Sequence, residues 1–151
     1  MKSSILQNFQ IQLAEYAEAE FSFSINYQSN ATYYYPDECL ITIHHGQSDV
    51  QKCISALHEL GHCKQSESKL SEVATKAGYQ SFIVAQEISA WEEGWTIYQS
   101  FNMTIPELEK QYWKTAAECI ASYILETTRY TKTQLTEIAT SYLRVDQEDE
   151  I

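Results

Sequence analysis

Residues 55–65 read SALHELGHCKQ, and this stretch decides how the rest of the chain is interpreted. It places His58 and His62 four residues apart, with Glu59 directly after the first histidine. Four residues of α-helix advance about 6 Å along the axis and return to the same face, so both imidazoles can reach one metal ion. Glu59 is near enough to hold a water molecule on that metal without being a ligand. The pattern predicts a metal site on a helix; the alternative is two solvated histidines that share a helix face.

The residues before the motif predict where this helix begins. Gly46 ends a preceding strand, Ser48 is a suitable N-cap, and Gln51 stands at the third helical position. The stripe of the helix that faces the core is expected to contain Val50, Ile54, Leu57 and Gly61.

Upstream of the motif, the hydrophobic period changes from that of a helix to that of a strand. Apolar residues at steps of three and four predict an amphipathic helix over 4–20. FSFSINY (21–27) alternates apolar and polar residues and CLITIHH (39–45) is rich in β-branched residues, so both are predicted strands, antiparallel to each other. The segment between them, ATYYYPDE (31–38), is expected to be a turn-like aromatic connection.

Downstream of the motif, only helices are expected. They are predicted over about 67–77, ending at Gly78, and over 80–101, 104–128 and 131–144. The acidic end DQEDEI is expected to be a flexible tail over 146–151. The expected fold is therefore α+β: one mostly helical domain over 1–145, with a small antiparallel β-sheet before the motif helix.

Charge and composition restrict the class of partner. The 151 residues carry 21 acidic and 10 basic side chains, a formal net charge of −11, which repels phosphate backbones and predicts no binding to nucleic acid. The N-terminus does not resemble a signal peptide, and no apolar run is long enough for a membrane span. The four cysteines form no CxxC pair and are expected to be reduced thiols, so the predicted compartment is the cytoplasm.

A catalytic zinc ion usually has a third protein ligand and leaves one position to water. The remaining histidines, His44 and His45, both precede the motif, so the third ligand must be a carboxylate, a cysteine or an upstream histidine. Cys63 points about 100° away from His62 around the helix and is better interpreted as a core thiol. Glu67 follows the motif too closely for the chain to fold back to the metal.

Glu87 is the preferred third ligand. It lies on the predicted helix 80–101, which is apolar on nearly every side, and an unpaired carboxylate there would be costly. Ala90, one turn later, is small enough to let this helix approach the motif helix closely, and Gly61 offers matching room. Glu92 and Glu93, which follow Trp91, remain competitors.

His58-Glu59-Leu60-Gly61-His62 followed by Glu87-x-x-Ala90 is similar to the gluzincin-type zinc metallopeptidases. The order of predicted elements looks most like the small intracellular ImmA/IrrE-type peptidases of bacteria, phages and mobile elements, over roughly residues 20–100. This resemblance implies a zincin-like domain in which His58, His62 and Glu87 bind Zn²⁺. It also implies that Glu59 is the general base for a zinc-activated water that hydrolyses peptide bonds of an intracellular protein.

A hydrogen-bond donor for the developing oxyanion is also required. Tyr98 is a candidate on the same helix face as Glu87, although about three helical turns separate the two along the axis. His44 and His45 end the strand that, in the resembling proteins, flanks the cleft and pairs with an extended substrate by strand addition. Their alternative interpretation is as satisfied surface histidines at a strand end.

Two functions compete. The first is a zinc metallopeptidase acting on a protein or peptide substrate. The second is a zinc-bound binding or inhibitor protein, for example one encoded by a phage, that uses the same scaffold without hydrolysis. The intact Glu59 argues against the second, because a binding protein has no need of a general base.

Overall fold

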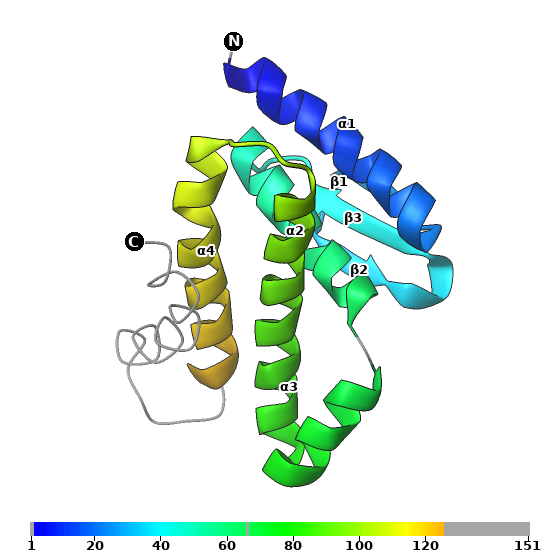
Figure 1. The fold of residues 1–151 in the computed structure, drawn as a ribbon, viewed down its shortest axis with the longest axis vertical. Helices are drawn as coiled ribbons and strands as arrows, with labels where there is room; N and C mark the ends of the chain where they lie inside the picture. The colour runs from blue at the N-terminus through cyan, green and yellow to red at the C-terminus, as the bar shows by residue number, and fades with distance from the viewer. Residues whose placement is uncertain (1, 66, 126–151) are drawn as a thin grey trace.

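Helix α1 (Lys2–Phe21) lies along a small β-sheet (Figure 1). The last two helices lie on the side of α2 (Asp49–Lys64) that is opposite α1. The computed structural model describes the backbone of residues 2–65 and 67–125 and the side chains of 5–65 and 84–124. The predicted helix over 131–144, the domain end at 145 and the tail over 146–151 lie outside these described residues. Helix α1 ends where Ser22 adopts a left-handed conformation with φ 57°, and the Ser22 amide donates to the Glu18 carbonyl at 3.1 Å.

The sheet has three strands, β1 (Ser24–Ser29), β2 (Tyr33–Tyr35) and β3 (Leu40–His44), in the order β1-β3-β2. Strand β3 is parallel to β1 and antiparallel to β2, so the sheet is mixed. The prediction that 39–45 pairs antiparallel with 21–27 is therefore wrong. The expected aromatic turn over 31–38 contains a strand, β2, followed by a short 3₁₀ helix, η1 (Pro36–Glu38).

The hydrophobicity of β3 explains why it takes the central position. Ile41, Thr42 and Ile43 are all buried, as expected for a strand with a neighbour on each side. The chain from β1 crosses past this position, forms β2 on the other side, and returns as β3 between the two. A direct hairpin would have left the most apolar strand at an edge.

The register of the sheet decides which of its side chains face the helices. Tyr34 pairs with Ile41, and Ile41 pairs with Ile25, so these three side chains share one face. Tyr34 stacks on His62 of α2, which identifies this face as the one packed against helices. Tyr33 and Tyr35 lie on the opposite face, where they are exposed and stack on each other.

Three helices follow the sheet: α2 (Asp49–Lys64), α3 (Glu67–Ser100) and α4 (Pro106–Leu125). The predicted start of α2 is confirmed, because the Ser48 hydroxyl accepts a hydrogen bond from the Gln51 amide at 3.3 Å. Helix α3 is assigned without a break where two helices were predicted, and Figure 1 shows that it bends sharply before its long straight part. A glycine inside a helix costs about 1 kcal/mol relative to alanine, which does not suffice to end the helix at Gly78.

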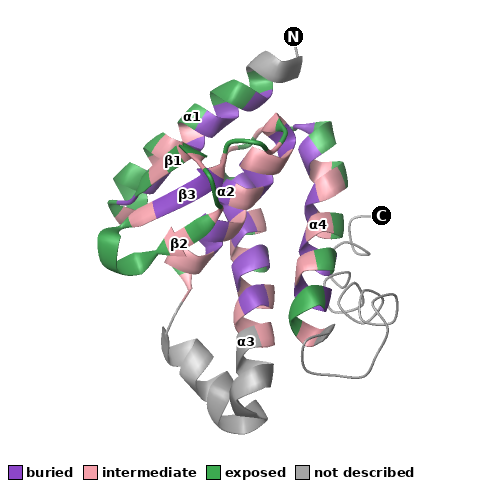
Figure 2. Ribbon diagram, turned by 180° about the vertical axis from the view of Figure 1, so that it is seen from behind, coloured by how far each residue is buried: buried purple, intermediate pink, exposed green. Residues whose placement is uncertain are grey.

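Helix α2 is the centre of the core. It contacts α1, α3, α4 and strands β2 and β3. Buried residues follow β3 and the facing sides of α2, α3 and α4 (Figure 2). Among the helices within 2–65 and 67–125, none combines the length and apolar character that a membrane span requires. The mostly helical α+β fold is as predicted.

Candidate metal centre

Helices α2 and α3 bring three potential ligands together. His58 and His62 lie on successive turns of α2, and Glu87 faces them from α3. Ligand atoms of the three residues all lie within 4.8 Å of one another. The Glu87 Oε2 atom is 3.0 Å from His58 Nε2 and 3.5 Å from His62 Nε2. This group, which could hold a metal ion, is the single one of its kind among the described side chains.

The close approach of α2 and α3 makes this meeting possible. A side chain on Gly61 would collide with the Ala90 carbonyl, and one on Gly94 would lie 2.5 Å from the Leu57 carbonyl oxygen. The predicted fit of Gly61 against Ala90 is confirmed. The two helices therefore cross with their backbones nearly in contact. At the site, the space between them has room only for the three ligand side chains.

Two polar atoms of the group are buried without a hydrogen-bond partner, namely Glu87 Oε2 and His58 Nδ1. The 3.0 Å contact of Glu87 with His58 does not have the geometry of a hydrogen bond. Buried polar atoms in proteins are normally satisfied. An orphaned carboxylate oxygen that faces two imidazoles is the arrangement expected where a cation completes the site.

The charges within the group shift its pKa values in opposite directions. Burial raises the pKa of Glu87, but its contacts with His58 and His62 lower it more, so the net pKa lies well below the usual 4.5. Burial lowers the pKa of His62, and the contact with Glu87 raises it more, to a net value above 6.5. Glu87 is therefore ionised at neutral pH, as a metal ligand must be.

Glu59 lies beside the group without belonging to it. Its Oε1 atom is 3.9 Å from His58 Nε2, and the residue is 8% exposed. Burial raises the pKa of Glu59, with His58 and His62 acting against the shift and Glu87 adding to it. A carboxylate with a raised pKa takes up a proton more readily, which suits a general base.

Aromatic rings hold both histidines. The Trp91 indole stacks on the His58 ring at 4.1 Å with an interplanar angle of 19°, and it is 2% exposed. Tyr34 stacks on the His62 ring at 5.6 Å and 22°. Tyr34 also lies near the Cys63 thiol, and burial raises the pKa of that thiol to about 12. Cys63 is thus a protonated thiol beside Tyr34, consistent with the interpretation that it is not a ligand.

Helix α4 contributes two side chains that the sequence did not single out. Burial, and then the nearby charge of Glu87, raises the pKa of the Tyr123 hydroxyl. Burial and then the charges of Glu87, Glu118 and Glu59 raise the pKa of Cys119 to about 11. Tyr123 follows the buried Ala116 and Ile120 at helical spacing and is itself 39% exposed, so it lies at the border of the inner face of α4. Nothing in the sequence says which element that face meets.

The structure brings His44 and His45 to each other and not to the triad. Their rings stack at 5.1 Å, and His44 Nδ1 accepts a hydrogen bond from the Gly46 amide at 2.9 Å. The strand that they end, β3, has a neighbour on both sides. It therefore has no free edge, and the expectation that this strand pairs with an extended substrate is wrong.

Tyr98 is used elsewhere in the fold. Its hydroxyl donates to Glu109 Oε2 at 2.5 Å and accepts from the Ile105 amide at 2.8 Å, which joins the end of α3 to the start of α4. Its ring packs on Phe9 and Trp95. Of the two competing carboxylates on α3, Glu93 pairs with Lys64 at 3.6 Å, and Glu92 is exposed.

No protein-family model, no curated protein and no solved structure matches this chain. The interpretation of the site therefore rests on the positions of its own residues.

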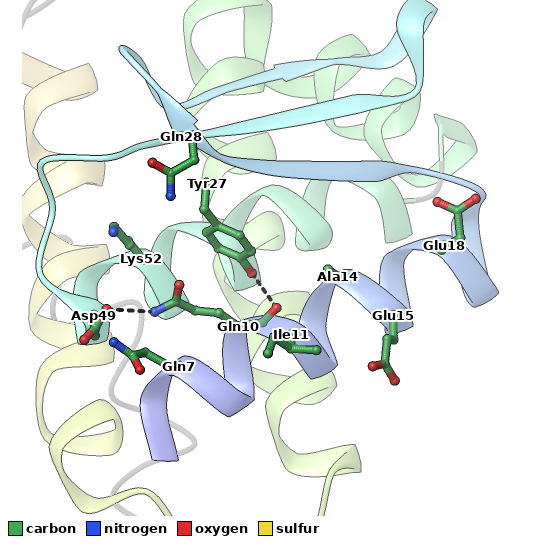
Figure 3. Close-up of a pocket in the computed structure, with 10 residues that line it drawn as sticks. All are labelled: Gln7, Gln10, Ile11, Ala14, Glu15, Glu18, Tyr27, Gln28, Asp49 and Lys52. Carbon is green, nitrogen blue, oxygen red and sulfur yellow. Dashed lines mark hydrogen bonds between the residues drawn. The ribbon is translucent and has the colours of Figure 1, made fainter. Parts of the chain in front are cut away.

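A separate open pocket of about 630 Å³ lies between α1, the end of β1 and the start of α2 (Figure 3). The Tyr27 hydroxyl points across it and donates to the Gln10 carbonyl at 2.9 Å, and the Gln10 amide reaches Asp49 at 3.1 Å. Its lining shares no residue with the triad. These hydrogen bonds join α1 to β1 and to the start of α2, so the polar residues that line the pocket help to hold α1 in place.

Proposed function

We propose that this chain is a zinc-dependent hydrolase of peptide bonds. The observation that carries the proposal is the convergence of His58, His62 and Glu87, with Glu59 on the same turn of α2 as His58. Two histidines that merely shared a helix face would not require a buried carboxylate from another helix between them.

The donor set supports zinc. Two imidazole nitrogens and one carboxylate oxygen form a common ligand set of catalytic zinc sites, which keep a fourth position open. Atoms bound tetrahedrally at 2.0–2.1 Å from one zinc ion are separated by about 3.3 Å. The two measured separations from Glu87 Oε2, 3.0 and 3.5 Å, lie on either side of that value.

Zinc bound here would supply a Lewis acid that lowers the pKa of water and polarises a carbonyl group. The chain's own residues supply the proton transfer. Glu59 is 3.9 Å from His58 Nε2, and its raised pKa lets its carboxylate take a proton and return it to a leaving amine.

Tyr123 is a side chain of α4 that could donate a hydrogen bond to developing negative charge. The charge of Glu87 raises the pKa of its hydroxyl, which supports a position near the ligand group. The raised pKa keeps the hydroxyl protonated at neutral pH, and a protonated phenol can donate. We propose Tyr123, in place of Tyr98, as the oxyanion donor.

Strand β2 offers the edge that β3 lacks. It is an outer strand of the sheet, and Tyr34 in its centre stacks directly on His62. An extended peptide that paired with the free edge of β2 would run past the ligand group. This supports a polypeptide substrate rather than a small molecule.

The test is metal content and peptide hydrolysis measured on the same preparations. Purified wild type, Glu87→Ala and Glu59→Gln are loaded with zinc, dialysed and analysed by mass spectrometry for metal. The same samples are incubated with a complex peptide library, and new termini are identified. We expect one zinc per chain in wild type and in Glu59→Gln, its loss in Glu87→Ala, and hydrolysis in wild type alone.

Two results would overturn the proposal in different ways. If wild type takes up no zinc, the triad is a buried polar cluster and not a metal site. Zinc uptake by wild type with no more cleavage than Glu59→Gln would identify a non-hydrolytic zinc-binding protein on this scaffold.

A further inference from the structure

Gln65 connects one proposed ligand, His62, to the helix that carries another, Glu87. It is the residue at which α2 ends, directly after Lys64. Its side-chain oxygen Oε1 is 3.0 Å from His62 Nδ1. Its side-chain nitrogen Nε2 donates to the main-chain carbonyl of Gln86 on α3, one residue before Glu87.

These two contacts fix the position of a proton. A main-chain carbonyl can only accept, so the Gln65 atom that faces the Gln86 carbonyl must be the amide nitrogen. The amide oxygen is then the atom that faces His62 Nδ1, and it can only accept. His62 must therefore carry its proton on Nδ1 in the neutral ring, which leaves the lone pair of Nε2 free.

The free Nε2 atom is the one that faces Glu87, at 3.5 Å. A histidine that binds metal through one ring nitrogen usually donates from the other to an outer partner, which fixes the tautomer and the ring orientation. His58 has no such partner: its Nδ1 atom is buried and unpaired among the described residues. The orientation of His58 is set instead by the stacked Trp91 ring.

We propose that Gln65 is a positioning residue: it holds His62 in the Nδ1-protonated form and ties this ligand to the α3 backbone beside Glu87. The relevance of this role to metal binding rests on the proposed zinc site, whereas the tautomer does not. Because Gln65 contacts no reacting group, its effect on zinc would pass through His62 and through the α3 backbone beside Glu87.

The first test uses the metal-free protein. The proton position on each ring is read from two- and three-bond proton–nitrogen correlations in protein labelled with ¹⁵N-histidine, at about pH 9, where histidine is normally neutral. The chain has four histidines, and His62→Gln assigns the signal. We expect Nδ1 protonation in wild type and in Gln65→Glu, whose carboxylate still accepts. In Gln65→Ala the proton should move to Nε2, where Glu87 is the remaining acceptor.

The second test measures zinc affinity by competition with a chromophoric chelator. Loss of an outer-shell partner costs about 10–100-fold in metal affinity, and we expect this loss in Gln65→Ala. Gln65→Glu keeps the acceptor for His62 but cannot donate to the Gln86 carbonyl, so it should restore part of the affinity. Gln86→Ala is the matched control and should leave affinity unchanged, since only its main-chain oxygen is used. Circular dichroism verifies that each variant is folded.

The outcomes separate this inference from the proposed function. Nε2 protonation in metal-free wild type, or an unchanged tautomer in Gln65→Ala, would overturn the role of Gln65 whatever zinc does. If the tautomer moves as expected but wild type takes up no zinc, the role of Gln65 in holding His62 is supported and the zinc hydrolase is rejected.

Discussion

The proximity of His58 to His62 could be predicted from the sequence, whereas the place of Tyr123 near Glu87 could not, because the first depends on local geometry and the second on long-range packing. The positions of His58 and His62 follow from the local geometry of one helix, which four residues of sequence determine. Glu87 required one further step, that a carboxylate on an apolar helix needs a partner. Tyr123 lies on a third helix, and its approach to Glu87 depends on how α3 and α4 pack.

The paired charges of His62 and Glu87 should stabilise the metal-free protein only within a window of pH. The folded pKa of Glu87 lies below its usual 4.5, so its contribution is present above that value and is lost as the pH falls. The folded pKa of His62 lies above its usual 6.5, so its contribution is complete below that value and is lost as the pH rises through the folded pKa.

We therefore expect the difference in free energy of unfolding between wild type and Glu87→Gln to be largest between pH 4.5 and 6.5. It should shrink on both sides of that range. Urea unfolding of both proteins in the presence of a chelator measures it. A difference that continued to grow above neutral pH would contradict this account of the pair.

Replacing Tyr123 by phenylalanine should lower peptide hydrolysis by about 10²–10³-fold, the usual cost of removing one oxyanion donor. Zinc content should not change, because the three ligands are intact. The check is the turnover number and the metal content of the same sample.

Tyr98→Phe is the matched control for that experiment. It removes a hydroxyl that bonds to Glu109 and Ile105, so unfolding should cost about 1 kcal/mol less. Hydrolysis per folded molecule should stay at the wild-type rate. If Tyr98→Phe were the slower enzyme, the roles of the two tyrosines would have to be exchanged.

At the scale of elements, the crossing of α2 and α3 sets the width of the site. Gly61→Ala places a methyl group against the Ala90 carbonyl, so the helices must separate. Overpacking of this kind typically costs 1–3 kcal/mol, and we expect a loss of about that size, with weaker zinc binding because Glu87 recedes from the histidines.

Thermal unfolding and zinc titration measure both effects. Gly46→Ala is the control, since its added methyl group meets only the His44 ring at 2.8 Å on an exposed turn. That ring can rotate away, so stability and affinity should remain near wild type. Equal effects of the two substitutions would mean that the crossing is not tight.

The sheet shows where strand-by-strand reading of the sequence fails. Alternation in 21–27 and the β-branched residues in 39–45 predicted two real strands, β1 and β3. Their pairing was wrong because β2, three residues long, carries too short a pattern to be distinguished from a turn. Once β2 occupies one side of β3, β1 must occupy the other, and the direction of pairing reverses.

At the scale of the whole molecule, α2 joins the sheet to the remaining helices, so a metal between α2 and α3 should stabilise the entire fold. Zinc at 100 times its dissociation constant adds about 2.7 kcal/mol, which should raise the melting temperature by roughly 5–10 °C. Glu87→Ala should abolish this increase. Glu93→Ala, which changes a carboxylate of the same helix that pairs with Lys64, should retain it.

The order of helices and strands through residue 125 was largely predictable, because hydrophobic period reports burial of each element by itself. The joining of 67–77 and 80–101 into one helix was not, since a single glycine has only a weak effect on helix continuity. The packing of α4 beside α3 at the site could not be predicted, because no local sequence pattern reports which helices are neighbours.

The stacking of Trp91 on His58 has an optical consequence. An indole ring 4.1 Å from an imidazole, and almost excluded from water, reports the electronic state of whatever that imidazole binds. Cobalt or copper in the site would quench its emission, whereas zinc would shift it without quenching. The chain has only two other tryptophans, Trp95 and Trp113, so replacing them by phenylalanine would leave Trp91 as the single tryptophan. Its emission, excited selectively over that of the tyrosines, would then report occupancy of the site.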